Sequence, residues 1–304
     1  MKICVVGADC FIGVPLVRRF LKSGNEVIAV VRPNSQNTCA LGFEQNISIV
    51  PLDFLCYDEL CERTGYFDCM VVLTWIGTRG LDRVNESLQK KNYQIIYKTI
   101  KSAIKNGCKK VLTAGSQAEY GLCDQIITEE TPCKPNTAYG KYKYKLFTNL
   151  ETYCKKNGVS FKEPRFFSLY GPGDYQGSLI MSTISKMING LECSFTDSTQ
   201  MWDYLYVEDA VEAVSLLCTK ECADGAYNLG SGDIRQLKEY IEELKKVLGS
   251  NSPLKYGVIQ FGPTGKISIQ PSIAKLKNEL NWAPKYTFAN GIKSTLKSLN
   301  NNGI

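Results

Sequence analysis

Short, wholly apolar runs alternate with longer amphipathic stretches through the first half of this 304-residue chain. A strand that reads as a continuous apolar run, rather than as an alternation of apolar and polar residues, has both of its faces buried. Such strands separated by helices are typical of a parallel sheet covered on both sides. The sequence therefore predicts a doubly wound α/β fold. The predicted strands are KICVVG, EVIAVV, ISIVPLD, CMVVLT, KVLTAGS and VSFKEPR, and the predicted helices between them cover VPLVRRFLKSG, 82–105 and 139–155.

This rhythm changes after the segment GPGD at residues 171–174. A helical pattern over 179–189 precedes a predicted strand, WDYLYV, and a helix that begins at Glu208. Two or three further helices are expected near the carboxyl end. We therefore expect a large sheet domain formed by 1–170, to which 201–228 return, and a smaller mixed lobe formed by 171–200 and 229–304.

Composition limits the chemistry and the partners of the chain. Its net charge of +6 comes from scattered lysines, which indicates a solvated surface rather than a nucleic-acid site. We expect a cytoplasmic protein with no membrane partner, because no leader pattern and no long apolar run is present. The 13 cysteines form no CxxC pair and the chain has no histidine, so neither a disulfide framework nor a metal site is predicted. Acid–base chemistry must use Tyr, Lys, Asp, Glu or Cys.

The segment GADCFIG, Gly7 to Gly13, joins the first predicted strand to the first helix. Such a turn directs backbone N–H groups and a helix N-terminus at a pyrophosphate, although a tight turn without a ligand has the same pattern. Cys10 stands where a middle glycine would let the phosphate approach closely. A small side chain that points away would leave dinucleotide binding intact.

Tyr139 and Lys143 are spaced four apart on a helical pattern, so both side chains lie on one face. A neighbouring ammonium favours the phenolate, and we expect it to lower the pKa of Tyr139. Ser116 follows a predicted strand at the sheet edge where doubly wound proteins bind ligands. It is placed to orient a carbonyl group and to pass a proton toward Tyr139. The alternatives are a surface tyrosine–lysine pair and a serine that only caps a turn.

Taken together, these segments resemble the extended short-chain dehydrogenase/reductases of the nucleotide-sugar epimerase, dehydratase and reductase group. The resemblance runs nearly end to end, and it is carried by GADCFIG, Asp53–Phe54, Asn92 in QKKNYQ, GSQAEYG, YGKYK, RFFSLYGPGD, WDYLYVEDA, YNLGSG and LNWAP. It implies a Rossmann dinucleotide-binding domain, a substrate-binding lobe and a homodimer. It also implies Ser116, Tyr139 and Lys143 as the catalytic residues. The implied cofactor-binding residues are Gly7, Cys10, Phe11, Ile12, Gly13, Asp53, Phe54, Leu73, Thr74, Asn92, Tyr139 and Lys143.

Departures from the family pattern narrow the expected reaction. Gln117 and Ala118 stand where dehydratases of this group carry an Asp–Glu pair, which argues against 4,6-dehydration. Trp202 stands where an arginine is usual, and Ser168 stands where an asparagine is usual. Lys266 is the nearest cation to a second missing arginine. The expected substrate-binding residues are therefore Ser116, Gln117, Ser168, Trp202 and Lys266, and the residues that hold the substrate diphosphate stay open.

The end of the second predicted strand, AVVRPN, bears on the choice of cofactor. NAD-preferring sites place an acidic residue there to bind the ribose hydroxyls. This chain has Arg32 instead, and an arginine pairs with a 2′-phosphate and stacks on adenine. An exposed arginine without this role is the alternative. NADP(H) is therefore favoured, with NAD(H) possible.

The expected function is reduction of a 4-keto sugar nucleotide, similar to that of the CDP-paratose and CDP-abequose synthase type of 4-ketoreductase. A nucleotide-sugar 4-epimerase that keeps NAD tightly bound would use the same residues. A dinucleotide-sensing regulator without turnover is the third alternative, and a complete Ser116, Tyr139 and Lys143 set argues against it.

Overall fold

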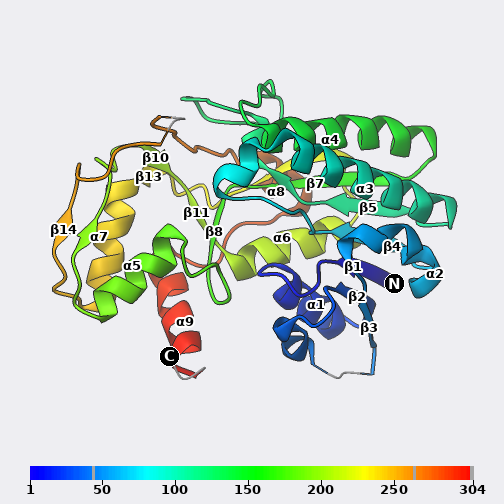
Figure 1. Ribbon diagram of the computed structural model, residues 1–304, viewed down its shortest axis with the longest axis horizontal. Coiled ribbons are helices and arrows are strands. Elements are labelled where there is room, and N and C mark those ends of the chain that lie inside the picture. Colours follow the sequence, from blue (N-terminus) through cyan, green and yellow to red (C-terminus); the bar gives the residue numbers. More distant parts are fainter. Residues whose placement is uncertain (43–44, 263–264, 302–304) are drawn as a thin grey trace.

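A computed structural model describes residues 1–42, 45–262 and 265–301, and its centre is a parallel sheet (Figure 1). The strand order is β12-β7-β5-β4-β1-β2-β3, and the short β6 also pairs with β7. The order changes direction between β1 and β4, and doubly wound folds bind ligands at such a point, beyond the carboxyl ends of the strands. The strands are β1 (Lys2–Val6), β2 (Glu26–Val31), β3 (Ile47–Pro51), β4 (Cys69–Val72), β5 (Lys110–Thr113), β6 (Gly115–Ser116), β7 (Ser160–Phe166) and β12 (Gly225–Leu229).

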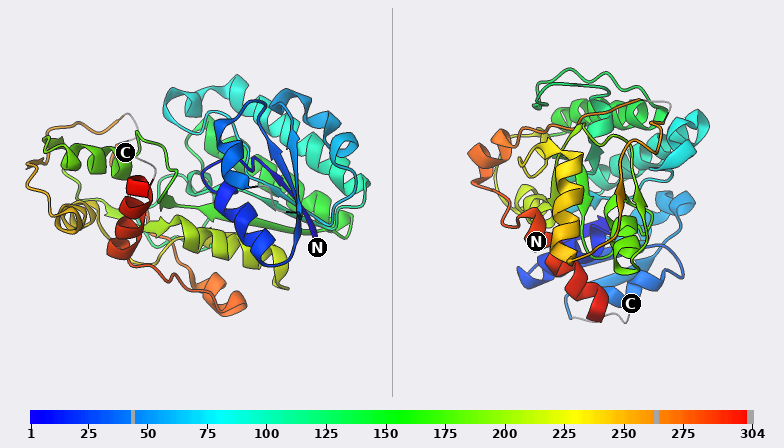
Figure 2. Two further views of the ribbon diagram at one scale, coloured as in Figure 1. Left: turned by 90° about the horizontal axis from the view of Figure 1, so that it is seen from below. Right: turned by 90° about the vertical axis from the view of Figure 1, so that its left-hand side faces the viewer.

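Helices cover both faces of this sheet, as the sequence predicted (Figures 1 and 2). One face carries α1 (Gly13–Lys22), α6 (Val207–Thr219) and α8 (Ala274–Leu280), and the other carries α2 (Leu60–Thr64), α3 (Glu86–Lys105) and α4 (Ala138–Lys156). Side chains of β1 alternate between the two layers. Ile3 and Val5 pack into the core that contains Phe20 of α1, whereas Cys4 and Val6 pack into the core that contains Ile96 of α3.

The starts of the two long helices follow from their capping residues. The side chain of Asn85 accepts the N–H of Leu88 at 3.1 Å, so α3 begins at Glu86 rather than at the predicted residue 82. The preceding residues form a 3₁₀ turn, η3 (Gly80–Val84). Thr137 likewise accepts the N–H of Gly140 at 3.1 Å, so α4 begins at Ala138. A capped start fixes where each helix face points.

The remaining elements form a smaller lobe at the left of Figure 1 and the connecting turns. The lobe contains three helices: α5 (Leu179–Ile188), α7 (Leu237–Leu248) and α9 (Phe288–Asn301). Its short strands are β9 (Cys193–Ser194), β14 (Leu254–Lys255), β10 (Met201–Trp202) and β13 (Arg235–Gln236). The other 3₁₀ turns are η1 (Gln36–Leu41), η2 (Phe54–Glu59) and η4 (Gln117–Glu119). The division of the chain into two domains at residue 170 stays a prediction.

The single strand predicted for WDYLYV is wrong. β10 pairs antiparallel with β13, whereas β11 (Tyr204–Tyr206) pairs parallel with β8 (Ser168–Tyr170). Asp203 lies between the two strands, and its buried carboxylate accepts the N–H groups of Ser231 at 2.7 Å and Gly232 at 2.6 Å. These hydrogen bonds fix the chain at Asp203, between β10, which pairs with β13, and β11, which pairs with β8. Within the described residues, no helix is both long enough and apolar enough to cross a membrane.

Candidate active site

The glycine turn after β1 admits no side chain at two of its positions. A Cβ on Gly7, whose φ is +87°, would lie 2.6 Å from Oγ1 of Thr74, and a Cβ on Gly13 would lie 2.4 Å from the carbonyl oxygen of Gly7. Both glycines therefore allow close packing of the turn, of the start of α1 and of the residues after β4. Thr74, one of the cofactor-binding residues implied by the resemblance, lies beside the turn. A cavity of about 410 Å³ adjoins this turn and is lined in part by Cys10, Phe11 and Asn37.

The Cys10 side chain does not point away from the turn, contrary to expectation. Its sulfur accepts the N–H of Gly13 at 3.2 Å, because the start of α1 presents N–H groups that have no partner within the helix. Burial raises the pKa of the Cys10 thiol, and hydrogen bonds from the backbone of Gly13 and Ile12 oppose this effect. The thiol thus accepts one of the N–H groups at the start of α1.

Arg32 has an acidic neighbour that the sequence argument did not find. Its Nε lies 3.2 Å from Oδ2 of Asp9, and the Arg32 side chain is 75% exposed while that of Asp9 is 3% exposed. Asn37 donates to the carbonyl oxygen of Asp9 at 3.0 Å. The sequence has no acidic residue at the end of β2, but the carboxylate of Asp9 reaches Arg32 there from the glycine turn.

Ser116, Tyr139 and Lys143 come together above the carboxyl edge of the sheet. Lys143 donates from Nζ to the carbonyl oxygen of Ala114 at 2.6 Å, and Nζ lies 5.9 Å from the centre of the Tyr139 ring. The Ser116 hydroxyl lies close enough to the Tyr139 phenol to lower its pKa. It also accepts the N–H of Ala118 at 3.2 Å. Ser116 therefore caps η4 and contacts the phenol at the same time, so the two interpretations of this serine do not exclude each other.

The pKa of Tyr139 is raised, not lowered as the sequence suggested. Burial of the phenol is the largest cause, while the Ser116 hydroxyl and the nearby Arg83 guanidinium oppose it. Lys143 is buried as well, and burial lowers its pKa to about 8. Desolvation disfavours the charged form of both groups, and it outweighs the opposing effects of Ser116 and Arg83 on Tyr139 and of Glu119 and Glu163 on Lys143.

Two further side chains of this site, Trp75 and Arg83, come from the segment between β4 and α3. The Arg83 guanidinium lies 4.6 Å from the centre of the Tyr139 ring, and Lys143 Nζ lies 4.1 Å from the Trp75 ring. Trp75 is held by its Nε1, which donates to Oε1 of Gln89 at 2.6 Å. The sequence argument missed both residues, because only the fold brings them next to α4. Their position after β4, at the switch point of the sheet, was the available signal.

Other predicted cofactor residues support the surrounding backbone. The Asn92 amide donates to the carbonyl oxygen of Ile76 at 2.8 Å and accepts its N–H at 3.1 Å, which holds the segment that carries Trp75. Asp53 accepts the N–H of Leu55 at 2.8 Å and so caps η2. Phe54 is buried in the core. The contribution of each residue to cofactor binding stays a prediction.

Two cavities adjoin the smaller lobe, and the first of them also borders the glycine turn. One, of about 380 Å³, is lined by residues that include Phe11, Arg79, Ser168 and Trp202. The second, of about 540 Å³, also borders Trp202 and extends along α5 into the lobe. Ser168 and Trp202 are thus brought together, and Gln117 directly follows Ser116 in η4. Lys266 lines neither cavity. Its ammonium donates to Thr199 and pairs with Asp197 at 3.6 Å instead.

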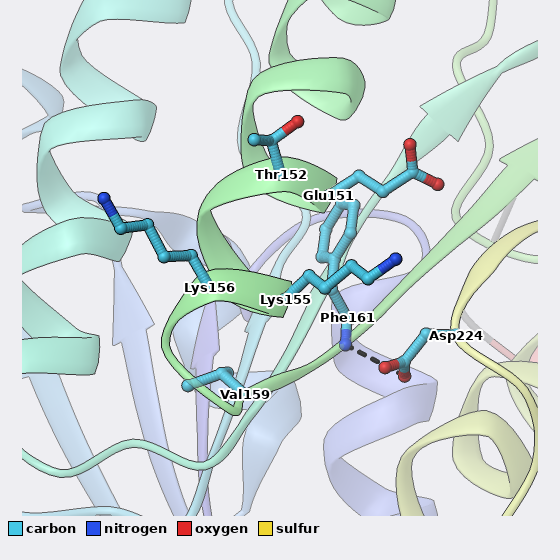
Figure 3. A pocket seen from close by; sticks show the side chains of 7 residues that line it. All are labelled: Glu151, Thr152, Lys155, Lys156, Val159, Phe161 and Asp224. Carbon is cyan, nitrogen blue, oxygen red and sulfur yellow. Dashed lines mark hydrogen bonds between the residues drawn. The ribbon is translucent and has the colours of Figure 1, made fainter.

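A larger hollow of about 760 Å³ lies away from these residues (Figure 3). It borders the carboxyl end of α4 and the start of β7, where Asp224 accepts the N–H of Phe161 at 3.0 Å. The start of a parallel strand lies at the opposite edge of the sheet from Ser116. This hollow is therefore separate from the candidate active site. No group of three or more Cys, Asp or Glu side chains that could hold a metal occurs in the described ranges.

A nucleotide turn at the switch point and a buried Ser–Tyr–Lys cluster beside it define a dinucleotide-dependent enzyme fold. The family model "NAD dependent epimerase/dehydratase family" matches residues 3–230. The chain therefore belongs to this family of enzymes.

Individual relatives differ in their reactions. The chain is 28% identical over 198 residues to a dTDP-glucose 4,6-dehydratase of Xanthomonas campestris, a match that covers 62% of the chain and 56% of the dehydratase. It is 27% identical to a dTDP-4-dehydro-6-deoxyglucose reductase of Escherichia coli, over 79% of the chain and 78% of the reductase. It is 22% identical to a CDP-abequose synthase of Salmonella muenchen, over 97% of each chain.

Solved structures match the fold over almost the whole chain. A UDP-glucose 4-epimerase of Thermotoga maritima superposes with a TM-score of 0.87 at 22% identity, covering 99% of each chain. A UDP-glucuronic acid 4-epimerase of Bacillus cereus, solved in complex with NAD, superposes with a TM-score of 0.84 at 20% identity, also covering 99% of each chain. At these identities the likeness establishes the fold.

Proposed function

We propose that the protein is an NADP(H)-dependent reductase of a 4-keto sugar nucleotide. The observation that carries this proposal is the buried Ser116, Tyr139 and Lys143 cluster, next to the Gly7–Gly13 turn at the switch point of the sheet. Gln117 and Ala118 follow Ser116 in place of an acid and a base, so elimination of water lacks its catalytic groups. The reductase of Escherichia coli and the synthase of Salmonella muenchen are relatives whose names agree with this class of reaction.

The residues of the cluster have distinct roles in the proposed reduction. The reduced nicotinamide, when bound, supplies hydride to the carbonyl carbon of the substrate. Tyr139 donates the phenolic proton to the carbonyl oxygen, and its raised pKa keeps that proton in place at neutral pH. Ser116 orients the same oxygen through its hydroxyl. Lys143, held by the carbonyl of Ala114, binds the cofactor ribose and stabilises the phenolate that remains after proton transfer.

We propose that Arg79 holds the substrate diphosphate. It is the one cation among the described residues that line the 380 Å³ cavity. Its side chain is 58% exposed, lies 3.5 Å from Asp174 and lies over the Tyr175 ring at 4.5 Å. We assign Arg79 the role of the arginine that Trp202 replaces. The adjoining 540 Å³ cavity suits the nucleotide base, because the buried Oε1 of Gln200 has no hydrogen-bond partner within the described residues.

Arg32 supports NADP(H) as the cofactor. Its guanidinium is mostly exposed beside the glycine turn, and an arginine there pairs well with a 2′-phosphate. The Asp9 carboxylate works in the opposite direction, because it neutralises Arg32 and would repel a phosphate. Asp9 therefore favours the second candidate function, a nucleotide-sugar 4-epimerase that keeps NAD bound through oxidation and re-reduction of the sugar.

A substrate panel separates these two functions. The purified protein is incubated with NADPH and a set of 4-keto sugar nucleotides, and the loss of reduced nicotinamide absorbance is compared with the products formed. A reductase consumes one NADPH for each alcohol produced. An epimerase interconverts sugar nucleotides that have no keto group, without net consumption of cofactor, and it co-purifies with bound nicotinamide. Epimerisation without NADPH loss would reject the reductase assignment.

We also propose that the protein is a homodimer formed through α3 and α4. The two helices lie side by side (Figure 1) and carry half-buried tyrosines that include Tyr93, Tyr97, Tyr142 and Tyr153. Lys101 and Lys145 lie over these rings at 5.0–5.9 Å. Light scattering on the purified protein tests this proposal, which a monomer mass would reject.

A further inference from the structure

The strand β7 carries charged residues in its buried middle section. Lys162 and Glu163 are each 1% exposed and Arg165 is 2% exposed. A strand in the centre of a parallel sheet is ordinarily apolar on both faces, because unpaired charges lose their hydration there. The proposed reaction uses none of these three side chains directly.

Arg165 joins Glu163 to the backbone of Ser116. Its Nε donates to Oε1 of Glu163 at 3.0 Å and to Oε2 of Glu119 at 3.1 Å. The other oxygen of Glu119 accepts the N–H of Ser116 at 2.7 Å. The Arg165 guanidinium is confined between the Tyr120 and Phe147 rings, at 4.7 and 4.8 Å. A movement of Glu163 would therefore be passed through Arg165 and Glu119 to the catalytic serine.

Glu163 also packs directly against the residue before Ser116. A Cβ on Gly115 would lie 2.7 Å from Cγ of Glu163 and 2.8 Å from Cγ of Arg165. Gly115 separates Ser116 from Ala114, whose carbonyl oxygen binds Nζ of Lys143. The Glu163 side chain thus supports the short segment that positions both Ser116 and Lys143.

Glu163 and Lys143 also influence each other's protonation. Burial raises the pKa of Glu163 well above its ordinary value, the nearby Glu119 raises it further, and Arg165 and Lys143 oppose the shift. Conversely, Glu119 and Glu163 counteract the lowering of the Lys143 pKa by burial. Two such buried groups lose their protons in linked steps. The charged and titratable groups around this network are Glu119 and Tyr120 after β6, Cys133 in the loop before α4, Tyr139 and Lys143 on α4, and Arg165 on β7.

We propose that Glu163 is a positioning residue for the catalytic cluster: it supports the Ala114–Ser116 segment, which carries the Ser116 hydroxyl and the carbonyl oxygen that binds Lys143. Since Glu163 lies beside this segment, its carboxylate also favours the charged form of Lys143. The proposal rests on the dinucleotide-binding part of the proposed function, because Lys143 is assigned to the cofactor ribose. It does not depend on which sugar is reduced, or on whether the reaction is reduction or epimerisation.

The test compares wild type with Glu163→Gln, which has nearly the same shape but cannot ionise. The dissociation constant of NADP⁺ is measured by quenching of tryptophan fluorescence at a series of pH values from neutral to alkaline. Affinity should fall where Lys143 loses its charge, and this midpoint should move down by about one pH unit in Glu163→Gln, since nearby charges shift a pKa by about one to three units. Glu163→Asp keeps the charge and should keep a midpoint near that of wild type.

Asp209→Asn is the matched control. Asp209 is also a buried carboxyl whose pKa is raised by burial, and it accepts the N–H groups of Lys285 and Tyr286. It belongs to α6, which covers the opposite face of the sheet from α4 and Lys143. This variant should leave the midpoint unchanged. If the Glu163→Gln midpoint coincides with that of wild type, or if Asp209→Asn moves it equally, Glu163 has only a structural role and the proposal is overturned.

A second measurement needs no cofactor. Because the pKa of Glu163 is raised by folding, its proton stabilises the folded state, and this contribution is lost as the pH rises through the folded pKa. Glu163→Gln should remove that part of the pH dependence of unfolding, and the same slope in both proteins would overturn the proposed ionisation. Wild type that binds no dinucleotide would instead reject the proposed function, while the unfolding data would still decide whether Glu163 ionises.

Discussion

The thiol of Cys10 contacts backbone N–H groups that, in a dinucleotide cradle, would face a phosphate. The glycine spacing correctly predicted a tight turn between β1 and α1. The close contacts at Gly7 and Gly13 arise because the strand passes directly into the helix, and they leave no room for a side chain at either position. The spacing could not indicate the direction of one side chain within that turn. That direction depends on which group accepts the Gly13 N–H, and in this structure the acceptor is the Cys10 sulfur, at 3.2 Å.

Replacing Cys10 with glycine should therefore free the Gly13 N–H for the pyrophosphate. We expect Cys10→Gly to keep or increase the affinity for the dinucleotide and to keep the fold, because glycine fits this turn without strain. Isothermal titration with NADP⁺ measures the affinity, and thermal unfolding checks the fold. A severe loss of stability would mean that Cys10 is needed for packing, and a clearly weaker affinity would mean that the thiol assists the ligand.

Arg32 and Asp9 make opposing contributions to the choice of cofactor. Because the guanidinium is the exposed partner, Arg32→Asp should reverse the preference of the protein from NADP to NAD, as a carboxylate repels the 2′-phosphate and accepts from the ribose hydroxyls. Competitive binding of the two cofactors measures the order. Asp9→Asn is the counterpart and should strengthen NADP binding. Equal affinities in wild type, or an unchanged order in Arg32→Asp, would remove the argument from Arg32.

At the scale of elements, periodicity and turn residues predicted most strands and helices of the sheet. Their signals are local: buried strands are apolar throughout and helices have a capped start. The break at Asp203 was missed because its cause is a contact with Ser231 and Gly232, distant in sequence. Trp75, Arg83 and Glu163 were missed at the active site for the same reason. Trp75 and Arg83 contact Lys143 and Tyr139, and Glu163 contacts Gly115, only because separate elements pack together in the fold.

Gly140 tests whether the close packing of α4 on η4 positions the catalytic side chains. A Cβ at this position would lie 2.2 Å from the carbonyl oxygen of Ala118, so α4 must shift to accept one. Gly140→Ala should destabilise the protein by about 1–3 kcal/mol, typical of overpacking, and should lower turnover by displacing Tyr139 and Lys143. Gly262→Ala is the control for stability alone, because no atom of the described residues lies within 4 Å of its added Cβ. Denaturant unfolding in which both variants matched wild type would contradict this account.

For the whole molecule, buried carboxyl groups determine how stability depends on pH. Burial is the largest cause of a raised pKa at Glu129, Glu163, Asp174, Asp203 and Asp209. A raised pKa means that the folded state binds the proton more strongly than the unfolded state does. The resulting stability is complete below the unfolded values, 3.8 for Asp and 4.5 for Glu, and is lost as the pH rises through the folded values.

The free energy of unfolding should therefore fall as the pH rises from about 4.5 toward neutrality. Carboxyls with lowered pKa, such as Asp68 and Asp197, act in the opposite sense but lie at the surface, where solvent screens them. Lys143, with a pKa lowered to about 8, acts only at higher pH. Urea unfolding across this range measures the trend. A free energy that rises steadily from pH 4.5 to pH 7 would show that the buried carboxyls are not the controlling groups.

The central claim is that the Tyr139 phenol donates the proton in a cofactor-dependent reduction. Tyr139→Phe keeps the ring, its contact with Trp75 and its position under Arg83, but it removes the proton. Single-turnover rates with NADPH and the substrate found in the panel, together with the NADP⁺ dissociation constant, separate chemistry from binding. The account predicts a rate lower by roughly 100- to 10,000-fold with nearly unchanged cofactor affinity. Near-normal reduction by Tyr139→Phe would contradict it and would assign the proton to another acid.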